Sequence, residues 1–115
     1  MPGVIEPLPV NEDLLFEVRT PLGWSVRAGR QQWLRISTIK HRTMAGKENE
    51  VRQVLRDPEQ IRRSRKDAAV YLFYRPLRPG RWICAVAKQV DNGSGFLVTA
   101  YSTEAIKQGE TVWRR

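Results

Sequence analysis

The sequence predicts an α+β fold: a small antiparallel sheet, made of an N-terminal hairpin and a C-terminal three-strand meander, with two helices packed on one face and a short C-terminal helix. Three patterns support this class. β-branched and aromatic residues fill three runs in the C-terminal half, and tight-turn sequences separate these runs. Near the N-terminus, apolar and polar residues alternate as in a half-buried hairpin. Between these two regions, apolar residues recur at helical spacing.

The length of the chain, 115 residues, fits one domain with a single core of modest size. Residues 1–12 contain three prolines and show little periodicity, so we expect a flexible tail there. Residues 13–115 are expected to form the single α+β domain.

The first predicted element is a hairpin. Residues 14–19 and 24–27 flank residues 20–23, whose sequence Thr-Pro-Leu-Gly is typical of a turn. We expect this hairpin to extend the main sheet or to pack beside it. Its alternating apolar residues are Phe16, Val18, Trp24 and Val26.

Two helices are predicted next. Residues 30–44 contain no proline or glycine, and a break follows at residues 45–46, where a glycine is typical of a helix end. A second helix spans residues 47–56 and stops at the Asp-Pro pair of residues 57–58, because proline cannot continue a helix. His41 falls near the end of the first helix, away from the centre of its apolar stripe. The stripes consist of Trp33, Ile36 and Ile39 in the first helix and of Val51, Val54 and Leu55 in the second.

A basic connector follows the helices at residues 59–67. Its cations are Arg62, Arg63, Arg65 and Lys66. This cluster fits a solvated connector as well as a patch that faces phosphate groups, and the sequence leaves both interpretations open.

The meander covers residues 70–75, 81–90 and 95–103. Residues 76–80, Pro-Leu-Arg-Pro-Gly, and residues 91–95, which contain an Asn-Gly pair, are expected to form the two turns. Connections this short cannot cross over, so neighbouring strands should run antiparallel.

This topology predicts which side chains meet. The end of the first strand, the start of the second and the end of the third lie at one edge, whereas Lys88 lies at the opposite edge. Because side chains alternate along a strand, Leu97, Thr99 and Tyr101 are expected to share one face. The group at the common edge comprises Arg75, Arg81, Thr99 and Tyr101.

The segment after the meander is expected to leave the sheet. Residues 103–108 are predicted to form a short helix with Thr103 as its N-cap. Gly109 would end this helix, and residues 111–113 would fold back over the sheet.

The net charge and the numbers of cysteine and histidine limit the kinds of partner and site that the protein can have. Lys and Arg number 20 against 12 Asp and Glu, and the net charge of +8 favours a polyanionic partner: nucleic acid, an acidic protein or an anionic membrane surface. A single cysteine, Cys84, excludes an intrachain disulfide framework, and a single histidine excludes an ordinary zinc site. Cys84 lies in an apolar strand, which predicts a buried, inert thiol. We therefore expect no metal and no cofactor.

Membrane and export signals are not expected. Charges interrupt every hydrophobic run well before the ~20 apolar residues that a membrane span needs. The first residues lack the basic region and apolar core of a signal peptide. The default expectation is a cytoplasmic protein that does not bind a membrane.

Short motifs between residues 30 and 113 occur in a characteristic order. They are His41, Met44, Val51 to Leu55, Asp57-Pro58, Ile61, Ser64, Tyr74-Arg75, Gly95, Thr99-Ala100-Tyr101, Thr103, Ile106, Gly109 and Trp113. Their order and spacing resemble the phage-associated branch of the barnase, EndoU, colicin and RelE-like nuclease superfamily. Two positions depart from that pattern: Arg42 stands where a proline would follow the histidine, and Ser102 stands where a proline commonly follows the tyrosine.

This resemblance implies helices packed on one face of an antiparallel sheet and the activity of a metal-independent endoribonuclease. Relatives in this superfamily are often toxins or phage-borne effectors. The implied partners are RNA and an acidic antitoxin or immunity protein that restrains the enzyme. The implied catalytic residues are His41, Arg75, Thr99 and Tyr101.

RNA cleavage without a metal uses the 2′-hydroxyl as an internal nucleophile, so the protein must supply a base, an acid and cations. His41 is the one available imidazole, a group suited to proton transfer near neutral pH. Arg75 would stabilise charge on the phosphate oxygens through its planar fork. Tyr101 would donate a proton to the leaving oxygen or stack on a base, and Thr99 would hold a phosphate oxygen.

A second hypothesis is a non-catalytic basic module with a nuclease-like fold that binds nucleic acid or a protein partner. Fold alone does not determine function, and positive charge alone gives affinity for nucleic acid. Under either hypothesis the expected nucleic-acid-binding residues are Arg81, Arg62, Arg63, Arg65 and Lys66.

Overall fold

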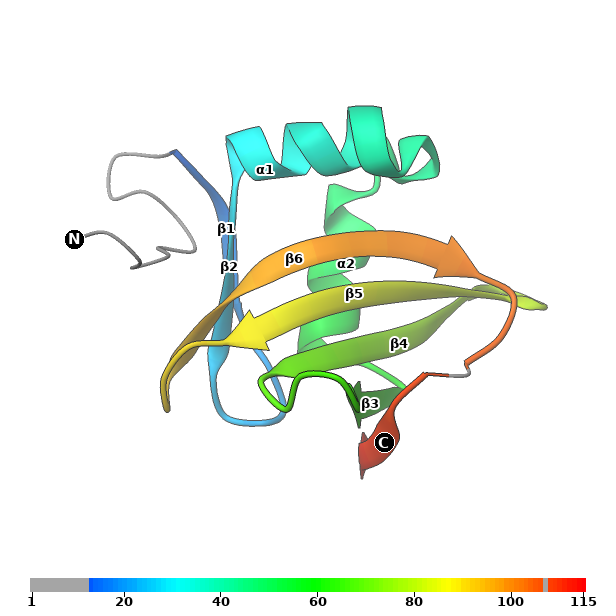
Figure 1. Ribbon diagram of the computed structural model, residues 1–115. Coiled ribbons are helices and arrows are strands. Elements are labelled where there is room, and N and C mark those ends of the chain that lie inside the picture. The colour runs from blue at the N-terminus through cyan, green and yellow to red at the C-terminus, as the bar shows by residue number, and fades with distance from the viewer. Residues whose placement is uncertain (1–12, 107) are drawn as a thin grey trace.

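The computed structural model describes residues 13–106 and 108–115, so the expected tail at residues 1–12 lies outside the described part of the chain. These residues form an α+β fold around one seven-stranded sheet with the strand order β1-β2-β6-β5-β4-β3-β7 (Figure 1). The strands are β1 (Leu14–Arg19), β2 (Ser25–Gly29), β3 (Gln60–Arg63), β4 (Val70–Arg78), β5 (Arg81–Gln89), β6 (Ser94–Thr103) and β7 (Glu110–Arg114).

The predicted hairpin and meander are confirmed. Strands β1 and β2 pair antiparallel, and so do β4 with β5 and β5 with β6. The hairpin extends the sheet because β2 pairs with the start of β6, and this pairing is parallel. In Figure 1 the hairpin stands steeply at the left, beside the end of the sheet where β6 begins.

The first predicted helix divides into three pieces: α1 (Arg30–Arg35), a π-helical turn (Ile36–Lys40) and a 3₁₀ turn (Arg42–Met44). The hydroxyls of Ser37 and Thr38 donate hydrogen bonds to backbone carbonyls one turn back, at 2.9 and 2.6 Å, a contact that bends helices. The His41 amide then bonds the Ile36 carbonyl at 2.7 Å, in the wider π spacing. This change of pitch leaves Ile39 75% exposed, contrary to its predicted place in the buried stripe.

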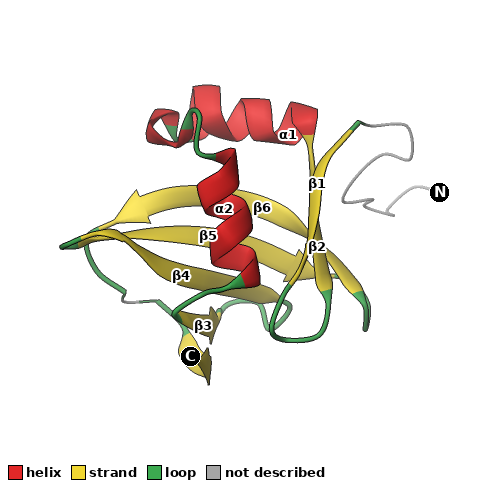
Figure 2. Cartoon of the chain, turned by 180° about the vertical axis from the view of Figure 1, so that it is seen from behind, coloured by secondary structure: helices red, strands yellow, loops and turns green. Residues whose placement is uncertain are grey.

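The second helix, α2 (Glu48–Arg56), covers one face of the sheet, as Figure 2 shows from behind. Its residues Val51, Val54 and Leu55 are fully buried, as predicted, and they belong to the main core with Phe73 and Leu97 of the sheet. Asp57 and Pro58 follow the last helical residue, so the predicted stop is confirmed as well.

The sheet is larger than predicted because the basic connector contains a strand. Residues 60–63 form β3, which pairs with β4 on one side and with β7 on the other. These pairings are not visible in the local pattern, because four residues rich in Arg do not alternate in polarity. The first part of the connector therefore lies within the sheet, whereas Arg65 and Lys66 lie in the exposed loop that follows β3.

The predicted C-terminal helix is wrong for the described residues of its range. Thr103 ends β6, and its hydroxyl caps a turn through the carbonyl and amide of Ala105. Ala105, Ile106 and Gln108 belong to no helix or strand, and Gly109 has a φ of 82° and lies against the backbone of Arg63. Strand β7 takes up the hydrogen-bonding groups at the outer edge of β3, which a helix could not do.

A β-bulge in β6 decides which side chains face each side of the sheet. The register shifts so that Val86 lies opposite Thr99 while Ala87 lies opposite Leu97, and Val98 has no partner. Leu97 is therefore buried in the main core, on the face of the sheet against which α2 packs, and its predicted place beside Thr99 is wrong. Thr99 and Tyr101 still share a face, as predicted, and that face is the one that α2 does not cover.

The face opposite α2, which we call the open face, carries a second and smaller buried cluster. Its centre consists of Leu72, Tyr74 and Cys84. Cys84 has no exposed surface, which confirms the predicted burial of its thiol. The partly buried residues around the cluster are Trp82, Val86, Tyr101 and Ile106. Within residues 13–106 and 108–115, no helix has the length and apolar character to cross a membrane.

Gly95 is expected to tolerate no side chain. A Cβ at this position would collide with the Lys88 carbonyl oxygen and would lie 2.6 Å from Cζ3 of Trp24, a buried side chain. We predict that Gly95→Ala lowers the free energy of unfolding by roughly 1–3 kcal/mol, the usual cost of overpacking, as measured by urea denaturation.

Gly93→Ala is the matched control, since the nearest atom to a Cβ there is Oδ1 of Asp91 at 4.0 Å. Its unfolding midpoint should stay close to that of the unchanged protein. Equal midpoints for the two variants would contradict the close approach at Gly95.

Candidate functional site

His41 and Tyr101 meet above the open face. His41 follows the π-helical turn, and its backbone is held on both sides, by the Ile36 carbonyl at 2.7 Å and by the Met44 amide at 2.9 Å. Tyr101 projects from β6 on the open face, opposite Cys84. The centroids of the two rings lie 5.6 Å apart with an angle of 36° between the planes. The end of the first helical segment therefore places the imidazole of His41 beside the ring of Tyr101.

A pocket with a volume of about 350 Å³ lies under these rings, and we call it the ring pocket. Aliphatic side chains of β4 and β5 form much of its wall, and polar groups come from the helix end, from β6 and from the loops that flank β3 and β7. The lining residues are His41, Ser64, Val70, Leu72, Val86, Thr99, Tyr101 and Gln108.

Thr99 supplies a polar atom to this wall. Its Oγ1 is buried and has no hydrogen-bond partner among the residues that the structure describes. A buried hydroxyl without a partner costs about 1–3 kcal/mol. Thr99 is thus the lining residue that gains most from a donor or acceptor on a bound molecule.

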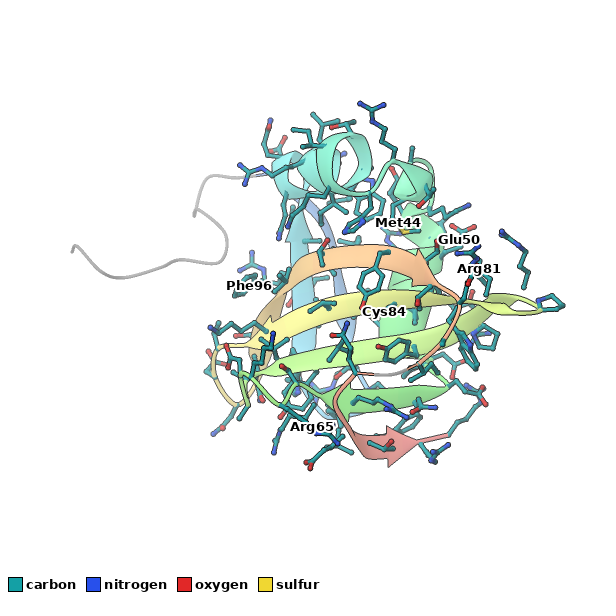
Figure 3. All side chains as sticks on the ribbon, turned by 45° about the vertical axis from the view of Figure 1, so that its right-hand side comes forward. Met44, Glu50, Arg65, Arg81, Cys84 and Phe96 are labelled. Atoms are coloured by element: carbon teal, nitrogen blue, oxygen red, sulfur yellow. The ribbon has the colours of Figure 1, made fainter. Side chains whose placement is uncertain are left out.

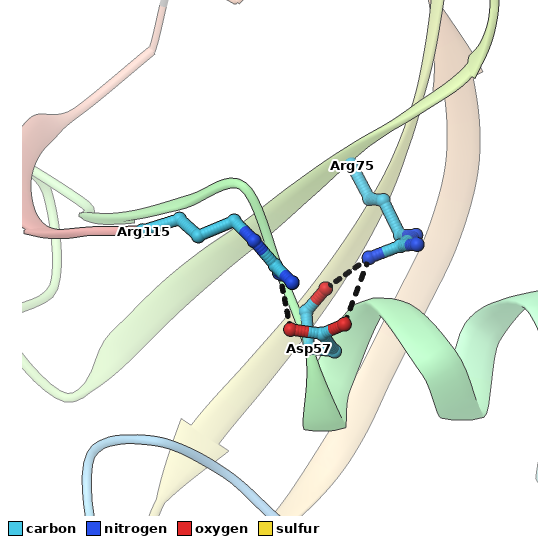
Figure 4. A network of polar contacts seen from close by, with 3 residues as sticks. All are labelled: Asp57, Arg75 and Arg115. Atoms are coloured by element: carbon cyan, nitrogen blue, oxygen red, sulfur yellow. Dashed lines mark hydrogen bonds and ion pairs between the residues drawn. The ribbon is translucent and has the colours of Figure 1, made fainter.

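Arg75 does not join this group. It lies opposite Ile83, and both side chains are on the face that α2 covers. Its Nη1 donates to the Asp57 carbonyl oxygen at 2.6 Å and to Oδ2 of the same residue at 3.3 Å (Figure 4). Arg115 bonds the other carboxylate oxygen, so Asp57 links the end of α2 to β4 and to the end of β7.

Arg81 also lies away from the ring pocket. It stands at the start of β5, beside the turn that joins β4 to β5, and pairs with Glu104 at 3.4 Å. In Figure 3 it appears at the right-hand edge of the sheet, whereas Cys84 lies near the middle of the open face. The expectation that both arginines share a site with Thr99 and Tyr101 does not match the structure, because alternation and strand twist separate residues at one edge.

The basic cluster divides between two faces. Arg63 lies over the ring of Tyr71, 5.2 Å from its centroid, on the side of the main core. Arg62 is on the open face, where it donates to the Gln60 side chain at 2.9 Å and to the Gly109 carbonyl at 3.4 Å. Neither lines a pocket beside His41.

Arg65 and Lys66 do border the site. They line a second pocket of about 350 Å³, which we call the cationic pocket. Figure 3 shows Arg65 below the sheet, on the side where β3 and β7 lie. The residues that line this pocket are Ser64, Arg65, Lys66, Leu72, Gln108 and Gly109. The two pockets share Ser64, Leu72 and Gln108, so they adjoin.

Lys88 lies at the end of β5 away from Arg81, as predicted, but the predicted separation from Thr99 is wrong, because Lys88 is directly opposite Val70 of the ring pocket. Its ammonium pairs with Asp67 at 3.2 Å. Several lining residues were not predicted. Strand alternation places the side chains of Val70, Leu72 and Val86 on the open face once the register is known. The sequence pattern alone therefore indicated a shared face but not the pocket. Gln108 carried no signal, since its position depends on the loop that leads to β7.

Two tyrosines and the cysteine of the open face stay protonated. Burial raises the pKa of Cys84 to about 12, and it raises the pKa of Tyr74 and of Tyr101 further, with smaller contributions from the neighbouring groups. Tyr101 is therefore a hydrogen-bond and proton donor at neutral pH and not a base.

No family model, curated protein or solved structure matches this chain. The resemblance to the nuclease superfamily therefore stays a prediction, and the function has to be argued from the geometry of the site. Among the described residues, no three His, Cys, Asp or Glu side chains are grouped so that they could hold a metal ion.

The Asp57 link makes stability depend on pH. Hydrogen bonding by Arg115, followed by the charges of Arg115 and Arg75, lowers the pKa of Asp57. The stability that the Asp57 carboxylate contributes is therefore fully present above the unfolded-state pKa of about 3.9. It is lost as the pH falls through the lower folded-state pKa. We predict that Asp57→Asn is less stable at pH 7 and that its deficit shrinks steadily below about pH 4.

Urea denaturation at a series of pH values measures this difference. Asp67 and Asp91 also have lowered pKa values, but they titrate in both proteins and cancel in the comparison. Parallel curves for the two proteins down to acid pH would contradict the role of Asp57.

Proposed function

We propose that the protein is a metal-independent endoribonuclease of toxin or phage-effector type that acts in the cytoplasm, with its active site at the ring pocket. The observation that carries this proposal is the approach of His41 and Tyr101, 5.6 Å between centroids, over a pocket that adjoins two cations. An imidazole and a protonated phenol can supply the base and the acid that intramolecular cleavage of RNA requires.

In this mechanism His41 takes the proton from the 2′-hydroxyl, and the 2′-oxygen attacks the adjacent phosphorus. A bond from the 2′-oxygen to phosphorus forms while the bond from phosphorus to the 5′-oxygen breaks. Tyr101, whose phenol is protonated at neutral pH, protonates or hydrogen-bonds the leaving 5′-oxygen. The products are a 2′,3′-cyclic phosphate and a 5′-hydroxyl.

Arg65 and Lys66 replace Arg75 as the cations of the proposed site. They lie on the open face next to the ring pocket, whereas Arg75 is bound to Asp57 on the other side of the sheet. Cations beside the scissile phosphate stabilise its developing charge. The same basic surface would suit an acidic antitoxin or immunity protein that blocks the pocket.

We predict that His41→Ala abolishes RNA cleavage in excess EDTA, with a loss on the order of 10²–10⁴-fold, because the general base is removed. Gel analysis of a mixed RNA, with assignment of the 3′ ends, measures this loss of cleavage. The unchanged protein should leave fragments with cyclic-phosphate ends, and the variant should leave the RNA intact.

Arg75→Gln is the control. It breaks the link to Asp57 and should lower the melting temperature, yet it should retain cleavage at temperatures where it is folded. Full activity of a folded His41→Ala would remove His41 from the mechanism, and loss of activity in a folded Arg75→Gln would place Arg75 in it.

A second candidate function is nucleic-acid binding without cleavage. It is favoured by the exposed side chains of Arg65 and Lys66, which make no ion pair within the described residues and would attract a nucleic acid without any chemical step. RNA that is bound in a salt-sensitive manner but never cut would establish this function. A strand of 2′-deoxy sugars separates the two, because cleavage requires the 2′-hydroxyl and binding does not.

A further inference from the structure

The two pockets of the open face differ in chemistry although they adjoin. The ring pocket offers the aliphatic side chains of Val70, Leu72 and Val86 together with the adjacent rings of His41 and Tyr101. The cationic pocket offers Arg65 and Lys66. Each has a volume of about 350 Å³, at the lower end of the ~300–1,000 Å³ typical of pockets for small molecules. A ligand that fills both needs a flat apolar part and an anionic part.

The loop that carries the cations is fixed in a turn. The hydroxyl of Ser64 accepts hydrogen bonds from the amides of Lys66 and Asp67, at 3.1 and 3.4 Å. Asp67, the acidic residue of this loop, is directed away: it accepts the Ala69 amide at 2.9 Å and pairs with Lys88 at 3.2 Å.

The two cations of the loop have no such partner. The side chains of Arg65 and Lys66 make no ion pair with any residue in the described ranges. Both residues are exposed, and an anion in the cationic pocket would meet them without competition from Asp67.

We propose that the open face holds one unpaired nucleoside, with its base in the ring pocket and the phosphate of the neighbouring nucleotide in the cationic pocket. This inference deepens the proposed function, on which it rests, since it names single-stranded nucleic acid as the form that the site takes. Bases of single strands stack on aromatic side chains. The phosphate of the next nucleotide in the strand is the anion that would reach the cationic pocket.

A duplex does not fit this arrangement. The aliphatic floor of β4 and β5 lies beneath His41 on one side and the Ser64 to Asp67 loop on the other, so a base reaches it only after leaving its stack. Oγ1 of Thr99, which has no partner among the described residues, belongs to the same wall and would be available to the edge of a base in the pocket.

The test measures binding of fluorescent 2′-deoxy hexanucleotides by anisotropy, so that cleavage plays no part. One strand is complete, one is paired with its complement, and six others each lack the base at one position. We expect the single strand to bind at least tenfold more tightly than the duplex. Removal of the base at one or two central positions should weaken binding on the order of tenfold, and removal elsewhere should change it little.

Two double variants test whether the cationic pocket binds a phosphate. Arg65→Gln with Lys66→Gln should weaken binding and reduce the slope of log K against log salt by about 0.7, the value for one phosphate contact on a single strand. Arg35→Gln with Arg56→Gln removes the same charge from exposed positions on the helices and should leave the slope unchanged.

Three results would overturn the inference: equal affinity for duplex and single strand, equal effects of base removal at every position, or equal slopes for the two double variants. RNA cleavage in EDTA is measured separately. If the expected binding pattern appears and RNA stays intact, the proposed cleavage fails while the nucleoside site stands. If RNA is cut and no base position matters, the nucleoside site fails while the cleavage stands.

Discussion

The arrangement of the open face depends on one extra residue in β6. Val98 has no partner across the ladder, so the alternation of side chains changes between Leu97 and Thr99. Without this bulge, a strand that buries Leu97 under α2 would also turn Thr99 and Tyr101 toward the helix, because its side chains have a strict period of two. The bulge allows Leu97 and Ala100 to face the main core while Thr99 and Tyr101 face the candidate site.

Charged residues have different roles on the two faces of the sheet. On the side of α2, Arg75 and Arg115 bind the two oxygens of Asp57 and tie the last turn of the helix to β4 and to the end of the chain. On the open side, Arg65 and Lys66 border a pocket and are exposed. A cation that already has a carboxylate partner is a poor ligand for a second anion, so the location of acidic residues decides which cations can meet phosphate.

The candidate site also depends on the irregular end of the first helical segment. A regular α-helix through residues 30–44 would continue past His41 with a different direction for its side chain. The hydroxyls of Ser37 and Thr38 bond backbone carbonyls, the helix widens, and the amide of His41 closes the π turn on Ile36. The imidazole then lies against Tyr101, a residue that is 60 positions later in the chain.

The sequence by itself determined the elements whose signal is local: the hairpin, the meander, the buried side of α2 and its stop at Asp57-Pro58, and the burial of Cys84. Three of the four catalytic residues that the resemblance implied, His41, Thr99 and Tyr101, line one pocket in the structure. Only the tertiary structure decided the pairing of β3 with β7, the face on which Arg75 lies and the pocket that Gln108 completes. These features depend on strand register and on contacts between segments that are distant in the sequence. Neither is determined by the local preferences of neighbouring residues, so the sequence pattern does not reveal them.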